Sequence, residues 1–143
     1  MNKWLTLFIA FSLQSAAVKA ETFISQDDYE TTLTFLLSSV EDHGLVISNR
    51  NFVNSMLKRT SEDVGADTQI YENADIVGFC SATLSYEAMK ADITSIQHCP
   101  YNIYIYQAKG EDDVILGYRD LPDTPELNAV EELLKSIIMS AIE

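Results

Sequence analysis

The spacing of apolar residues changes between helical and strand-like along the chain, and this pattern predicts its secondary structure. Apolar residues recur at helical spacing over 29–40, after an acceptable cap at Ser25–Asp28 and before Gly44, which suits a helix terminus. A further helix is expected over Ala82–Asp92. The clearest helix follows Thr124–Pro125, which provides an N-cap with proline at the first helical position.

Runs rich in β-branched and aromatic residues predict strands between these helices. Val114–Arg119 is expected to pair with Asn102–Ala108 as a hairpin across a polar turn. The other expected strands lie at Thr22–Ser25, Leu45–Ser48 and Ile76–Cys80, with a short helix over 52–57. This order predicts an α+β fold. Helices should pack on one face of a mainly antiparallel sheet of about five strands, followed by a C-terminal helix.

The first twenty residues have the three-part pattern of a secretory signal peptide. Lys3 is followed by a short apolar run and then by small residues that end at Ala20. We therefore expect a signal peptide over 1–20, a single domain over 21–143, and a periplasmic or secreted location. No later run is apolar for long enough to span a membrane, so no stable membrane anchor is expected after cleavage.

Acidic residues dominate the chain, which carries a formal net charge of −13. Without residues 1–20, seven basic residues face 22 acidic ones, for a formal net charge of −15. The basic residues form no stripe, so nucleic acid and anionic lipid are excluded as partners. The acidic excess is typical of a solubilising surface, and a basic protein partner is the alternative.

The two cysteines, Cys80 and Cys99, are the sharpest chemical feature of the sequence. The predicted helix between them runs about 16 Å out, and the residues after it can extend roughly 20 Å back. The two side chains can therefore meet at one edge of neighbouring strands, and in an exported protein we expect a structural disulfide.

Other uses of the cysteines remain open at this stage. A redox-active pair is one, although eighteen residues separate the cysteines and Cys-x-x-Cys is absent. A metal site formed by Cys80, Cys99 and His98 is another, without zinc-finger spacing. No catalytic motif supports an enzyme, and the sequence identifies no cofactor.

Tyrosines on the predicted hairpin suggest a binding surface. Tyr104 and Tyr106 share one face of their strand, and Tyr118 is expected to stand beside them. If this face is uncovered, it exposes an apolar patch typical of a ligand cleft or a partner surface, and a homodimer is the simplest version. The alternative is that the C-terminal helix covers the tyrosines.

Several segments resemble the family known as domain of unknown function 302. They are the strand that ends at Cys80, the helix Tyr86–Asp92, His98–Cys99–Pro100 and Tyr104–Ile105–Tyr106. The resemblance implies a curved sheet with helices on one side, as in TATA-binding protein, without implying DNA binding. Both family cysteines are kept. The chain departs from the family in having Ser81–Ala82 after Cys80 and proline after Cys99.

The sequence thus predicts an exported binding or interaction protein stabilised by a Cys80–Cys99 disulfide. The alternative is a thiol-redox or metal-carrying accessory protein that uses the same two cysteines. The family resemblance implies no activity that would separate these functions.

Overall fold

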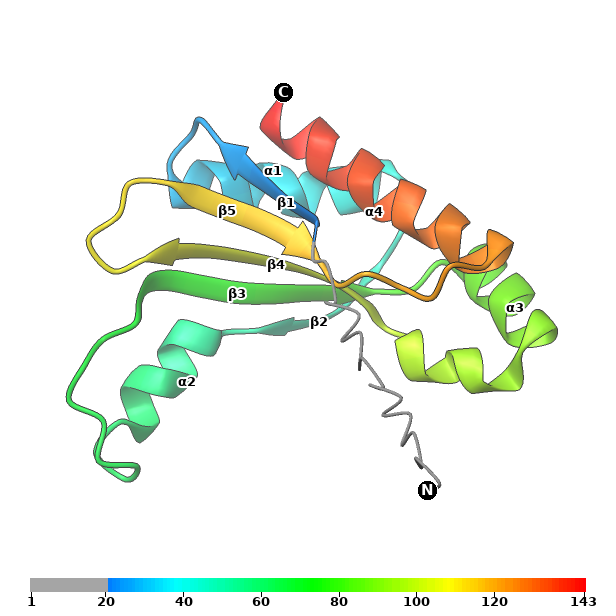
Figure 1. Ribbon diagram of the computed structural model, residues 1–143. Helices are drawn as coiled ribbons and strands as arrows, with labels where there is room; N and C mark the ends of the chain where they lie inside the picture. The colour runs from blue at the N-terminus through cyan, green and yellow to red at the C-terminus, as the bar shows by residue number, and fades with distance from the viewer. Residues whose placement is uncertain (1–20) are drawn as a thin grey trace, which may run out of the picture.

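Five antiparallel strands and four α-helices make up residues 21–143, the part of the chain described by this computed structural model (Figure 1). The expected signal peptide, residues 1–20, lies outside the described residues. In chain order the elements are β1 (Glu21–Ser25), α1 (Tyr29–Asp42), β2 (Ile47–Asn51), α2 (Val53–Thr60), β3 (Tyr71–Phe79), α3 (Ala82–Ala91), the 3₁₀ helix η1 (Ile93–His98), β4 (Tyr101–Ala108), β5 (Val114–Tyr118) and α4 (Pro125–Ile142). The predicted α+β class is confirmed.

The strands form one sheet in the order β1-β5-β4-β3-β2, and every neighbouring pair is antiparallel. Helices α1 and α4 pack against each other and against the same face of the sheet, while α3 packs on α4 (Figure 1). Apolar residues from both layers, such as Leu36, Val77, Ile105 and Ile138, are fully buried between them. This is the expected arrangement of helices on one face.

The helix ends carry the side chains that their sequences predict. Asp28 caps α1 by accepting from the Thr31 amide at 3.0 Å, and Thr124 caps α4 with Pro125 at its start. Gly44 follows α1 with φ at +73°, the left-handed conformation that glycine adopts easily.

The second strand differs from the prediction. It covers Ile47–Asn51 rather than Leu45–Ser48, because its pairing with β3 contains a bulge between Ile47 and Asn49 and continues through polar residues. As an edge strand, β2 can carry polar side chains that a central strand would not. The 3₁₀ helix η1 was not expected, and β3 begins five residues before Ile76.

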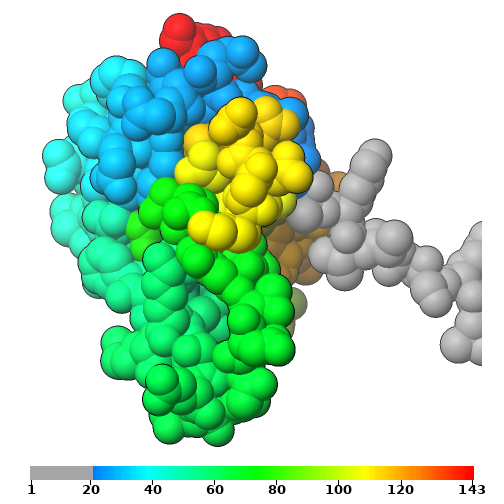
Figure 2. Space-filling view, turned by 90° about the vertical axis from the view of Figure 1, so that its left-hand side faces the viewer, coloured from blue at the N-terminus to red at the C-terminus, as the bar shows by residue number. Residues whose placement is uncertain are grey.

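Helix α2 covers an edge that β2 leaves open. β2 pairs with β3 only from Ile76 onward, so the first half of β3 has no strand on that side. There the Asn54 amide donates to the Glu72 carbonyl. The α2 segment and the loop after it form a lobe that projects from the body (Figure 2).

None of the helices within residues 21–143 is long and apolar enough to cross a membrane.

Candidate functional site

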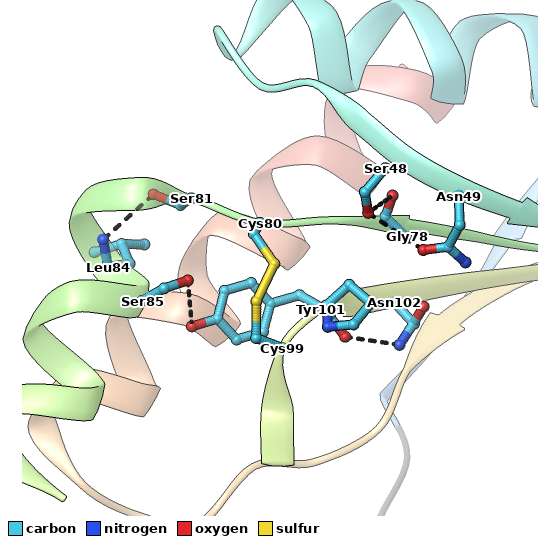
Figure 3. The surroundings of a disulfide bond; sticks show 11 residues. Ser48, Asn49, Gly78, Cys80, Ser81, Leu84, Ser85, Cys99, Tyr101 and Asn102 are labelled. Atoms are coloured by element: carbon cyan, nitrogen blue, oxygen red, sulfur yellow. Dashed lines mark hydrogen bonds between the residues drawn. A yellow bond between two sulfur atoms is a disulfide. The ribbon is translucent and has the colours of Figure 1, made fainter. Parts of the chain in front are cut away.

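The two cysteines form a disulfide at one end of the central strands, as the sequence predicted (Figure 3). Cys80 follows β3 and precedes Ser81, the N-cap of α3, while Cys99 lies between η1 and β4. Their Cα atoms are 6.3 Å apart. The bond lies just beyond the last paired residues of β3 and β4. It therefore joins the two ends of the segment that contains α3 and η1, which we call the α3–η1 excursion, at the edge of the sheet.

Hydrogen bonds hold the backbone around the disulfide. Ser85 on α3 donates to the buried Tyr101 hydroxyl at 3.3 Å, and the Asn102 amide donates to the Pro100 carbonyl at 2.8 Å (Figure 3). The Cys99–Pro100 peptide bond is cis. The start of β4 is thus fixed both to α3 and to its own turn.

The same geometry bears on the metal hypothesis. Both sulfur atoms are bonded to each other, so neither offers a thiolate to a metal in this state. Within residues 21–143 no three His, Cys, Asp or Glu side chains are grouped to hold a metal ion. His98 is half-buried at the end of η1, directly before Cys99.

The second predicted feature, the tyrosine face, lies on the side of the sheet opposite α1 and α4. Tyr104 and Tyr106 stack with ring centroids 6.2 Å apart, and Tyr71 meets Tyr106 edge-on at 5.6 Å. Tyr104 pairs with Gly117, and its ring occupies the space that a side chain at position 117 would need. Burial first, and then the neighbouring Tyr106 and Asp120, raise the pKa of the Tyr104 hydroxyl, so it stays a proton donor.

Tyr118 does not belong to this face, which corrects the prediction. It pairs with Ile103, whose side chain points into the core, and only 2% of Tyr118 is exposed. Its ring packs against Phe23, and its hydroxyl donates to Glu21 at 2.6 Å. Alternation along β5 places it with Leu116 and Val114 rather than with Tyr104.

The uncovered face carries no charged side chain at its strand positions. We define this open face by the strand residues whose register aligns them with Tyr104: Thr22, Ile24, Asn49, Asn51, Tyr71, Ala74, Ile76, Gly78, Asn102, Tyr104, Tyr106, Ala108, Ile115 and Gly117. Ile24 is 52% exposed. In a chain with 22 acidic residues, such a neutral, partly apolar surface is a candidate recognition site.

A concavity of about 440 Å³ lies at the disulfide end of the open face. Tyr104 and Ile76 provide an aromatic and an aliphatic wall, while His98 and Arg119 stand at its rim. Arg119 forms no ion pair with residues 21–143. This volume lies in the range of small-molecule sites. His98 and Arg119 suit a ligand that carries an acidic group or a hydrogen-bond acceptor.

Sequence reasoning found Cys80, Cys99, Tyr104 and Tyr106 but missed Arg119 and the amides beside it. Arg119 directly follows a strand, and only the register of β5 brings it near His98. Sequence reasoning also missed a partly buried ion pair, Arg50–Asp75 at 2.6 Å. A lone acid within the apolar run of β3 was the available signal, since a buried carboxylate requires a partner.

Solved structures and family relationships agree with this fold. The crystal structure of an uncharacterized conserved DUF302 protein from Bacillus stearothermophilus matches with a TM-score of 0.65 at 14% sequence identity, over 86% of this chain and 94% of that one. At that identity the likeness shows the fold alone. No curated protein matches the sequence. Residues 21–141 match the family described as Domain of unknown function DUF302, which confirms the resemblance seen in the sequence. The chain therefore belongs to the DUF302 family.

Proposed function

We propose that this protein is an exported binding module that recognises its partner with the open face, and that the partner is a second copy of the same chain. The observation that carries the proposal is the absence of charge on that face in a molecule whose described part has a formal net charge of −15. Two such molecules repel one another at most other orientations. Contact through the open face brings them together where repulsion is smallest.

The side chains of the open face support the same pairing. Tyr71, Tyr104 and Tyr106 provide broad, stiff contact area, and tyrosine is enriched in the centres of interfaces. At the rim, Arg119 and His98 are available to acidic side chains, which a second copy supplies in abundance. The Cys80–Cys99 disulfide holds this end of the face in place.

Light scattering on the oxidised protein tests the proposal. We expect a dimer at micromolar concentration that Tyr106→Glu converts to a monomer, because the change buries a charge in the contact. Val46→Glu is the matched control, since Val46 is 79% exposed in the loop after α1 and should leave the dimer intact. A protein that stays monomeric up to hundreds of micromolar would contradict the dimer. A Tyr106→Glu variant that still dimerises would show that the contact lies on another face.

A thiol-redox or metal-carrying role for the cysteines is the second candidate. The observation in its favour is that Cys80 and Cys99 are half-buried rather than enclosed, so a partner thiol can reach them. Isolation from the exported fraction without reductant, followed by immediate alkylation and intact mass, distinguishes the roles. An unalkylated species two hydrogens lighter than the dithiol supports the structural disulfide and the oxidising location. Two alkylated cysteines, or a metal that copurifies with them and His98, support the second candidate.

A further inference from the structure

A second polar site lies away from the open face, where the start of α1 meets β2, β3 and α2. A concavity of about 230 Å³ opens there, lined by residues of α1, β2, β3 and α2. Its lining includes Tyr29, Arg50, Lys58 and Asp75. None of these four residues belongs to the open face, although Ala74 of that face also lines the concavity, so the polar groups of the site are separate from the proposed dimer contact.

An ion pair fixes the floor of this concavity. Arg50 Nη2 lies 2.6 Å from Asp75 Oδ2, and the Asp75 side chain is only 8% exposed. The Phe52 ring covers the guanidinium, with its centroid 4.7 Å from Arg50 Cζ. Because the guanidinium is held by a carboxylate and a ring, its remaining N–H groups point in fixed directions.

Two buried donors in this site have no acceptor. The Tyr29 hydroxyl and Arg50 Nε are both buried, and neither makes a hydrogen bond of ordinary geometry within residues 21–143, although the Asp75 carboxylate lies near the Tyr29 hydroxyl. Tyr29 as a whole is 5% exposed. Burial first, and then the charge of Asp75 and its nearby acceptor oxygen, raise the pKa of the Tyr29 hydroxyl, so it keeps its proton. Buried donors without acceptors are rare and costly, which points to a missing partner.

We propose that this concavity binds a carboxylate, whose oxygens accept from Tyr29 and from Arg50 Nε. The missing partner must be an acceptor, because a guanidinium nitrogen can only donate. Of the two cations that line the concavity, Arg50 is paired with Asp75, whereas Lys58 forms no ion pair with residues 21–143. Glu30 also lines the concavity, so its two cations and two acids balance overall, and Lys58 attracts a carboxylate as a cation outside any ion pair of the described residues. The volume suits a ligand of a few heavy atoms, either a small free acid or the carboxyl terminus of a peptide.

The test is an NMR titration of the oxidised protein with sodium acetate at constant ionic strength set by chloride. We expect saturable shifts of the Tyr29, Arg50 and Asp75 amides, and much weaker ones with acetamide. Tyr29→Phe should weaken acetate binding about tenfold or more, since hydrogen bonds to charged groups are worth that much. Tyr101→Phe is the matched control, because Tyr101 is equally buried but bonded to Ser85. If N-acetylalanine binds more tightly than acetate, the natural carboxylate is the terminus of a peptide chain. If acetate binds more tightly, the natural ligand is a small free acid.

Stability without any added carboxylate provides a second readout. Tyr29→Phe should leave the free energy of unfolding unchanged or raise it, because it removes an unpaired buried hydroxyl. Tyr101→Phe should lower it. The proposal would be overturned if acetamide were as effective as acetate, or if the shifts did not saturate. It would also be overturned if Tyr29→Phe lowered the free energy of unfolding as much as Tyr101→Phe, because the Tyr29 hydroxyl would then already have a partner such as Asp75.

Discussion

At the scale of single residues, Tyr104 and Gly117 define the open face. A β-carbon at position 117 would meet the Tyr104 ring and would lie 2.6 Å from the Glu21 carbonyl oxygen. The ring thus fills the place of the absent side chain, and β1 closes in from the other side. Glycine here permits a close approach that no larger residue allows.

Gly117→Ala should therefore destabilise the protein by about 1–3 kcal/mol, the range of overpacked sites. Gly78→Ala is the matched comparison and should cost less. The three atoms nearest to its new methyl belong to the amide ends of Asn49 and Asn102, which can turn aside, whereas the Glu21 carbonyl is backbone. Urea denaturation of both variants checks this, and an equal or larger loss for Gly78→Ala would contradict it.

Residue spacing predicted part of the open face and failed at one tyrosine. Alternation within β4 correctly put Tyr104 and Tyr106 together. Tyr118 lies on another strand, and its side of the sheet depends on the register set by the five-residue turn between β4 and β5. A shift of one residue reverses every side chain, and no local pattern fixes that register.

At the scale of elements, the helix caps contribute a pH-dependent part of stability. Asp28 accepts from the Thr31 amide and hydroxyl, and these bonds lower the pKa of its carboxyl from the ordinary value of 3.8. A carboxyl with a lowered folded-state pKa stabilises the fold above its unfolded pKa, and the contribution is lost as pH falls through the folded pKa.

Asp28→Asn should accordingly be less stable than the parent protein by a constant amount above about pH 4.5, and the difference should shrink at lower pH. Asparagine keeps the cap geometry but does not titrate. Urea denaturation between pH 7 and pH 2.5 measures the difference. Asp112→Asn, in the exposed β4–β5 turn, is the control and should give a flat difference; a flat Asp28→Asn curve would disprove the assignment.

The disulfide supports the α3–η1 excursion as an element. Cysteines 19 positions apart close a loop whose constraint on the unfolded chain is worth about 3 kcal/mol. We expect the Cys80→Ala/Cys99→Ala variant to lose about that much stability and to exchange its α3 amides faster, while α1 stays protected. Reductant should weaken the parent protein to the same degree and leave the variant unchanged. A variant as stable as the parent would remove the structural role.

Element positions were predictable wherever local pattern and packing agree. Pro125 and the apolar stripe after it fixed α4, and the run before Phe79 fixed the core of β3. The sequence misled at β2, where the apolar residues Leu45 and Val46 precede a strand that is polar after its first residue, Ile47. An edge strand is held by backbone pairing with its neighbour, so its side chains need not show strand-like alternation.

At the scale of the whole molecule, charge sets how two copies can meet. Each described chain carries a formal net charge of −15, so dimerisation through the open face must overcome long-range repulsion. The range of that repulsion falls from about 30 Å at 10 mM salt to about 8 Å at 150 mM.

The proposed dimer should therefore tighten several-fold as salt rises from 10 to 150 mM, the reverse of an interface held by ion pairs. Sedimentation equilibrium measures the dissociation constant. Asp42→Lys, exposed at the end of α1 on the helix side, should tighten the dimer at 10 mM salt without touching the contact. Weakening with salt would mean instead that rim charges such as Arg119 dominate the contact.

The first and last parts of the described chain hold each other. Strand β1 pairs only with β5, nearly the whole chain later, and Glu21 bonds both Tyr118 and Lys135 on α4, the latter at 3.0 Å. Strand β5, which β1 joins, and α4, whose Lys135 bonds Glu21, are both made late in synthesis. β1 therefore stays without its partner strand while most of the chain is made, so the N-terminal edge of the sheet is among the last parts of the molecule to be fixed in place.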